Sequence, residues 1–127
     1  MQFFLVYVRE AHPTEGDRGD RQARTGPKIA QAKTADQRAI AASDCVRDLK
    51  LSIPVLLDDM DSTTEQAYRG WPARLVIIDI EGRVAYGNPS GPDGANPKNA
   101  PAVLDRLLAN NGRMTPLAPA TQPSRRD

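Results

Sequence analysis

The sequence is poor in cysteine, in aromatic residues and in net charge. Cys45 is the only cysteine among 127 residues, so no disulfide can form within the chain and a cysteine-based zinc site is not expected. Lysine and arginine number 17 against 16 acidic residues, which leaves a formal net charge of +1, and aromatic residues make up 5%. This composition gives no reason to expect a nucleic acid or an anionic membrane as a partner.

Long apolar runs are missing as well. No segment approaches the roughly 20 apolar residues that a helix needs to cross a bilayer. Residues 1–8 are largely apolar, but they have no basic segment before them and no small-residue cleavage site, so they do not match a secretion signal. We therefore expect a cytoplasmic protein with no membrane partner.

Short apolar runs predict four strands. Residues 3–8 are rich in aromatic and β-branched types without alternation, which favours a strand buried on both faces. Residues 53–57 form a second run, and residues 75–80 form the clearest buried strand. Glu81-Gly82 is a tight-turn signal, and residues 83–86 follow as the hairpin partner of that strand.

Two helices are predicted between these strands. Thr34 with Gln37 has the spacing of a capping box and starts the first helix. The expected apolar face of this helix comprises Ile40, Ala42, Cys45, Val46 and Leu49. Ser62 with Glu65 gives a second capping box before a short helix, which Gly70 would end.

A last helix is predicted over about residues 99–110, and Gly112 stops it. Its expected apolar stripe comprises Val103, Leu104, Leu107 and Leu108. Residues 13–33 are polar and rich in glycine, which indicates a long loop. The order of elements predicts an α/β architecture in which helices cover a mixed sheet. We expect one domain over residues 1–112 and a disordered tail over residues 113–127.

Two side chains near the end of the first strand are candidates for chemistry. His12 is the only histidine, and Glu10 lies two residues before it. Ligands of α/β proteins bind beyond the carboxyl ends of strands, and a carboxylate can orient an imidazole and share a proton with it. The alternative interpretation is a loop histidine beside a solvated glutamate.

Other candidate sites have simpler explanations. A group of acidic residues resembles a metal cluster, namely Asp58, Asp59, Asp61 and Glu65, but the loop lacks the glycine and the final acid that an EF-hand requires. Helix capping accounts for them, so no metal is expected. Cys45 lies on the apolar face of a predicted helix, well past its first turn, which favours a structural cysteine. The Trp71-Pro72 bond precedes the strongest strand and is a candidate for a cis peptide.

Several motifs together resemble the iodothyronine deiodinase family, in particular its bacterial deiodinase-like members. Residues 7–16, Tyr-Val-Arg-Glu-Ala-His-Pro-Thr-Glu-Gly, resemble the family's tyrosine, glutamate and histidine motif. Residues 55–60 resemble its later strand with aspartate and methionine. The hairpin strand over residues 75–78 and the glycine-proline loop over residues 91–94 also match, in the same order along the chain.

The resemblance implies a thioredoxin fold and an oxidoreductase with a cysteine or selenocysteine nucleophile. It implies that Glu10 and His12 bind substrate and relay protons, and that Tyr7 and Tyr86 line the site. A small-molecule substrate and an external thiol reductant are then expected, with no bound cofactor. Arg9 stands where vertebrate members usually carry an acid. The Trp71-Pro72 pair resembles the cis-proline position of thioredoxin-like proteins.

The segment that carries the nucleophile in this family is not found in the sequence. In the family it lies a few tens of residues before the tyrosine motif, at the end of a central strand, whereas Met1 is six residues before Tyr7. Cys45 does not align with it. We therefore expect an N-terminally incomplete thioredoxin-like sheet, and a fragment whose gene encodes cysteine, or selenocysteine as UGA, farther upstream.

Two other functions remain open at this point. The chain could be a non-catalytic binding domain that keeps the fold, or a peroxiredoxin- or thiol-disulfide-type redox protein on the same scaffold. A homodimer is a further possibility, because a second copy of the chain could fill the gap that the missing strand leaves in the sheet.

Overall fold

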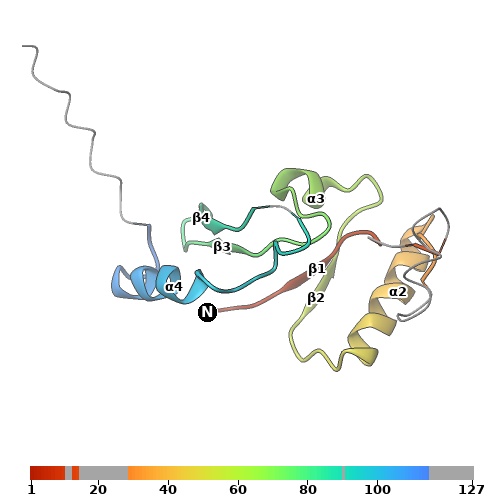
Figure 1. Ribbon diagram of the computed structural model, residues 1–127, viewed down its shortest axis with the longest axis horizontal. Helices are drawn as coiled ribbons and strands as arrows, with labels where there is room; N and C mark the ends of the chain where they lie inside the picture. The colour runs from red at the N-terminus through yellow and green to blue at the C-terminus, as the bar shows by residue number, and fades with distance from the viewer. Residues whose placement is uncertain (11–12, 15–28, 90, 115–127) are drawn as a thin grey trace, which may run out of the picture. The chain divides into compact units, whose positions relative to one another are not determined.

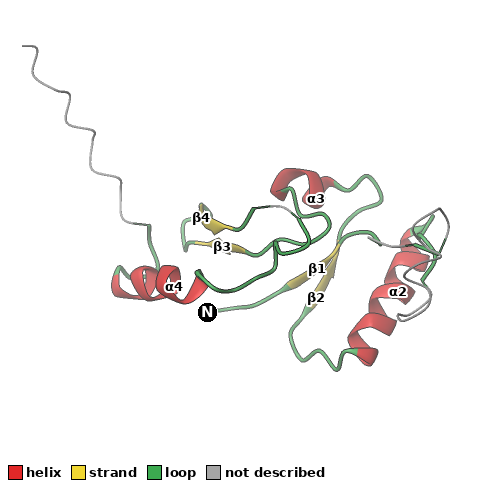
Figure 2. Cartoon of the chain, viewed as in Figure 1, coloured by secondary structure: helices red, strands yellow, loops and turns green. Residues whose placement is uncertain are grey.

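The computed structural model describes residues 1–10, 13–14, 29–89 and 91–114 (Figure 1). It contains β1 (Leu5–Tyr7), α2 (Ala35–Asp48), β2 (Val55–Leu57), α3 (Thr63–Tyr68), β3 (Val76–Ile78), β4 (Val84–Gly87) and α4 (Ala100–Ala109) (Figure 2). These elements confirm the α/β class. By their contacts the residues divide into two units, one formed by residues 1–75 with 88–96, the other by residues 76–87 with those from 97 onward.

The first unit is built around a parallel pair of strands. β1 pairs with β2, so that Leu5 is opposite Val55 and Tyr7 is opposite Leu57. The N–H of Asp58 donates to the Tyr7 carbonyl at 3.0 Å and closes the ladder. Because the strands are parallel, the segments that follow Tyr7 and Leu57 leave the sheet at the same end.

The expected burial of the first strand on both faces is wrong. Phe3 is 58% exposed, and Phe4 and Val6 on the same strand region are exposed as well. β1 pairs with β2 alone, and among the described strands none borders its other edge. The described residues form two separate two-stranded sheets rather than the single mixed sheet that we expected.

Helix α2 begins where the sequence indicates. The Thr34 hydroxyl accepts the N–H of Gln37 at 3.2 Å, as an N-cap does. The Gln37 side chain, however, accepts the N–H of Lys33 rather than that of Thr34. The buried positions of the helix are Arg38 and Ala42, whereas Leu49, expected on the apolar face, is 65% exposed.

The capping box predicted for α3 does not form. Ser62 adopts a left-handed backbone conformation with φ of 59°, and its side chain makes no cap hydrogen bond. The carboxylates of Asp58 and Asp59 accept the first N–H groups of this helix instead. The helix ends at Tyr68, and Arg69 rather than Gly70 takes the left-handed position after it.

The second unit contains the predicted hairpin. β3 and β4 are antiparallel, and Gly82 with φ of 79° lies in the turn between them. The buried Asp79 carboxylate accepts the N–H groups of Glu81 and Arg83, each at 2.9 Å. Burial alone would raise the pKa of Asp79, but hydrogen bonds from Arg83, Met114 and Glu81 lower it to about 2.

Helix α4 confirms the prediction for residues 99–110, with Asn99 and Asn110 as its caps. Val103 and Leu107 are buried, whereas Leu108, expected on the same stripe, is exposed. After the helix, the N–H of Gly112 donates to the Leu107 carbonyl at 2.6 Å. Within the described part of the chain, no helix has the length and apolar character to cross a bilayer.

The segment after α3 and the loop over residues 91–96 pack closely together in the first unit. The Trp71-Pro72 peptide bond is cis. The N–H of Leu75 donates to the Gly94 carbonyl at 2.7 Å. A Cβ atom on Gly94 would lie 1.9 Å from the carbonyl oxygen of Ala73, so only glycine fits this approach.

We expect Gly94→Ala to destabilise the protein by about 2 kcal/mol, because the added methyl group has no space and the backbone must move. Urea unfolding monitored by circular dichroism measures this change. Gly70→Ala is the matched control, since its Cβ would meet backbone atoms of Glu65 only at 3.8 Å. Equal stabilities of the two variants would show that residues 73 and 94 are not packed as described.

Candidate functional site

The candidate site lies beyond the carboxyl ends of β1 and β2. Tyr7 ends β1, and Arg9 and Glu10 follow it, while Asp58 directly follows β2. The hydrogen bond from the Asp58 N–H to the Tyr7 carbonyl holds together the points where the chain leaves the two strands. This is the end of a parallel sheet at which ligands of α/β proteins bind.

Glu10 is the member of the predicted Glu10–His12 pair that the structure describes. Its side chain is partly buried, and burial raises the pKa of its carboxyl group above the ordinary value. A carboxyl group with a raised pKa retains its proton closer to neutral pH, which is where a general acid must hold one. His12, its predicted partner, lies outside the described residues. The Glu10–His12 pair therefore stays a prediction.

The two predicted site tyrosines lie in different units. Tyr7 is partly buried in β1, and its buried hydroxyl makes no hydrogen bond within the part of the chain that the structure describes. A buried hydroxyl without a partner is costly, and a bound ligand would satisfy it. Tyr86 lies in β4 of the second unit, opposite Ile77. The proposed lining of one site by both tyrosines stays a prediction.

Cys45 does not have the environment of a nucleophile. It lies near the end of α2, far from the helix N-terminus that would stabilise a thiolate. Burial raises the pKa of its thiol, and the carboxylates of Glu10 and Asp48 raise it further. The thiol is therefore protonated at neutral pH, in agreement with the interpretation of Cys45 as a structural cysteine. Because the Glu10 carboxylate raises the pKa of Cys45, Glu10 lies close enough to α2 for the two groups to interact electrostatically.

Arg9 is the site residue that sequence reasoning missed. Its Nε lies 2.9 Å from Oε2 of Glu65 in α3, and its Nη2 lies 3.4 Å from Oε1 of the same carboxylate. The guanidinium carbon is 5.0 Å from the centre of the Trp71 ring. No local signal reveals these contacts, because Arg9 lies 56 residues before Glu65 and is still farther from Trp71.

Of the acidic residues after β2, Asp58 and Asp59 serve as helix caps. The Asp58 carboxylate accepts the N–H groups of Thr64 and Glu65 at 2.8 Å each. Arg38 of α2 donates to the carbonyl oxygens of Asp58, at 3.1 Å, and of Asp59. Burial alone would raise the pKa of Asp58, but the hydrogen bonds from Glu65 and Thr64 lower it overall. Among the described residues, no three His, Cys, Asp or Glu side chains gather as metal ligands would.

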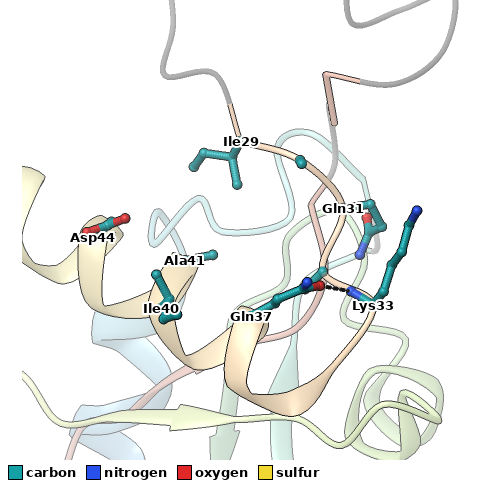
Figure 3. Close-up of a pocket in the computed structure, with 9 residues that line it drawn as sticks. Ile29, Gln31, Lys33, Gln37, Ile40, Ala41 and Asp44 are labelled. Carbon is teal, nitrogen blue, oxygen red and sulfur yellow. Dashed lines mark hydrogen bonds between the residues drawn. The ribbon is translucent and has the colours of Figure 1, made fainter.

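A pocket of about 460 Å³ lies elsewhere in the first unit, between residues 29–33 and the first half of α2 (Figure 3). Its polar side chains are those of Gln31, Lys33, Gln37 and Asp44. Neither Tyr7 nor Glu10 lines this pocket. Of the residues predicted to carry chemistry, the described ones, Tyr7, Glu10 and Tyr86, do not line it.

The family model for iodothyronine deiodinase matches residues 1–108. The chain is similar to thyroxine 5-deiodinase of Gallus gallus, with 33% identity over 92 residues that cover 72% of the chain and 34% of that protein. It is also similar to type I iodothyronine deiodinase of Xenopus laevis, with 28% identity over 104 residues that cover 82% of the chain and 39% of that protein. The chain thus spans between about a third and two fifths of the length of these curated relatives.

We expect Asp58→Ala to destabilise the protein by about 1–2 kcal/mol at neutral pH, because α3 loses its cap. The pKa of Asp58 is lower in the folded protein than its ordinary value of 3.8, so this contribution is complete above that pH. It is lost as the pH falls through the lower, folded-state pKa. Urea unfolding of both proteins between pH 7 and the acid limit measures the difference.

Asp61→Ala is the matched control for this prediction, since Asp61 is exposed and precedes the same helix. We expect its effect to be small at every pH. A stability difference between Asp58→Ala and the unmodified protein that stays constant through the acid range would contradict the capping role.

Proposed function

Because the chain belongs to the iodothyronine deiodinase family, we propose that it is the proton-managing part of a thioredoxin-fold, deiodinase-like oxidoreductase. Its substrate would be a small organic halide, and its reductant an external thiol. The observation that carries this proposal is the placement of Glu10. This partly buried carboxyl group, with a raised pKa, lies just beyond the carboxyl end of β1.

We further propose that the nucleophile is a thiolate or selenolate supplied from outside these 127 residues. Cys45 is the only cysteine, and burial and nearby carboxylates disfavour its thiolate. The open edge of β1 supports a missing neighbour, because an added strand would pair with the backbone groups that no described strand bonds there. A second copy of the chain would cover the same edge, and sedimentation at increasing concentration distinguishes the two arrangements.

The proposed reaction exchanges a carbon–halogen bond for a carbon–hydrogen bond. The thiolate or selenolate attacks the halogen, the carbon–halogen bond breaks, and the halogen is transferred to sulfur or selenium. The carbon takes up a proton, which protonated Glu10 supplies together with His12. One external thiol then displaces halide and forms a mixed disulfide or selenenyl sulfide. A second thiol releases the nucleophile, so that the two thiols leave as a disulfide and provide both electrons.

In the longer protein that includes the nucleophile, we expect Glu10→Gln to lower thiol-dependent halide release about 100-fold, because the glutamine amide cannot donate the proton as an acid. Cys45→Ser is the matched control and should leave turnover unchanged. Steady-state halide release measures both. Loss of turnover in Cys45→Ser with full turnover in Glu10→Gln would reverse the assignment and make Cys45 the reactive group.

The 127-residue chain alone should show no thiol-dependent halide release or peroxide reduction, because its thiol is protonated and partly buried. An assay with an excess of dithiol and an iodinated phenol, and a second with hydrogen peroxide, test this expectation. Substrate binding without turnover would favour a binding domain. Turnover that persists after replacement of both Glu10 and His12 would contradict the proposed site.

A further inference from the structure

Arg9 is adjacent to Glu10 in the chain, yet the guanidinium of Arg9 pairs with a different carboxylate, that of Glu65. The guanidinium meets the Glu65 carboxylate through two nitrogen atoms, Nε at 2.9 Å and Nη2 at 3.4 Å. It also lies over the Trp71 ring, at 5.0 Å from the ring centre. One side chain thus connects the segment after β1 to α3 and to the residue before Pro72.

The chemistry of these contacts requires arginine. A guanidinium is planar, so it can meet a carboxylate with two nitrogens and present a face to an aromatic ring at the same time. A lysine ammonium is a point charge and can do only one of these. The side chain of Glu65 is 12% exposed, so few water molecules reach its carboxylate. Arg9 supplies the hydrogen bonds and the opposite charge that water would otherwise provide.

The partner of Arg9 is itself fixed in place. The N–H of Glu65 donates to the Asp58 carboxylate at 2.8 Å, and the N–H of Asp58 donates to the Tyr7 carbonyl. The contacts from Tyr7 through Asp58 and Glu65 to Arg9 therefore form a closed loop. This loop ties down the backbone on both sides of Val8, directly before Glu10.

We propose that Arg9 is a positioning residue. Its two-nitrogen ion pair with Glu65 and its stacking on Trp71 hold Glu10 at the carboxyl end of β1. This inference rests on the proposed function of Glu10. Arg9 is the neighbour of Glu10 in the chain, and the Glu10 carboxylate raises the pKa of the Cys45 thiol in α2. The charge of Arg9 is paired with Glu65, and burial raises the pKa of the Glu10 carboxyl group.

Two substitutions in the 127-residue chain test the inference, Arg9→Lys and Glu65→Gln. Both variants keep a positive charge at residue 9 and nearly the original side-chain volume. Both lose the ion pair in which two guanidinium nitrogens meet one carboxylate. In both variants Glu10 is released to solvent, which lowers its pKa. In Glu65→Gln the charge of Arg9 also loses its carboxylate partner, and this acts in the same direction. We expect the pKa of Glu10, measured by carbon-13 NMR titration of its carboxyl group, to fall to its ordinary value of 4.5 or below in both variants.

Arg47→Lys is the matched control. Arg47 is an exposed arginine of α2 that is paired with Asp44 and Asp48, and its replacement should leave the pKa of Glu10 unchanged. An unchanged Glu10 pKa in both Arg9→Lys and Glu65→Gln would overturn the positioning role. The activity of Glu10→Gln in the longer protein is a separate readout. Full turnover there, with a fall of the Glu10 pKa in these variants, would reject the proposed function while Arg9 still positions Glu10.

Discussion

A buried arginine holds the first unit of this protein together. Arg38, only 3% exposed, extends from α2 to the carbonyl oxygens of Asp58 and Asp59, where the chain leaves β2. Both hydrogen bonds come from Nη1, whereas the buried Nε of Arg38 has no partner among the described residues. Because a buried guanidinium is costly without hydrogen bonds, moving these carbonyl groups away would leave Arg38 still less satisfied. With its backbone fixed, Asp58 can direct its carboxylate at the N-terminus of α3 and thereby orient Glu65.

The candidate site depends on this polar framework more than on a large apolar core. The buried apolar side chains of the described residues are few and small, namely Ala42, Ala100, Val103 and Leu107. In the first unit, hydrogen bonds and ion pairs join the ends of β1 and β2, and Glu10 follows directly. The apolar face of β1 stays exposed.

Local signals in the sequence predicted the elements that depend on local contacts. Thr34 caps α2 because its hydroxyl reaches an N–H three residues later, and Gly82 forms the hairpin turn because it tolerates positive φ. Contacts across the chain could not be predicted in this way. Ser62 lost the capping role to Asp58 and Asp59, and nothing in the spacing of Arg9 and Glu65, 56 residues apart, indicates their ion pair. The prediction that the first strand is buried on both faces failed for the same reason, because burial depends on which elements lie beside β1. For the candidate site, the sequence pointed to Glu10. The structure shows that Glu10 follows β1 and that burial raises the pKa of its carboxyl group.

We propose that Glu10 serves a nucleophile encoded outside this sequence. Reading the gene upstream of the Met1 codon, with any in-frame UGA translated as selenocysteine, tests this most directly. The account predicts an apolar strand pattern that ends in cysteine or UGA, followed by the start of a helix and then by Met1 in the same frame. A true start at Met1 with no coding frame above it would contradict the account and leave a binding domain whose resemblance to the deiodinases is one of ancestry.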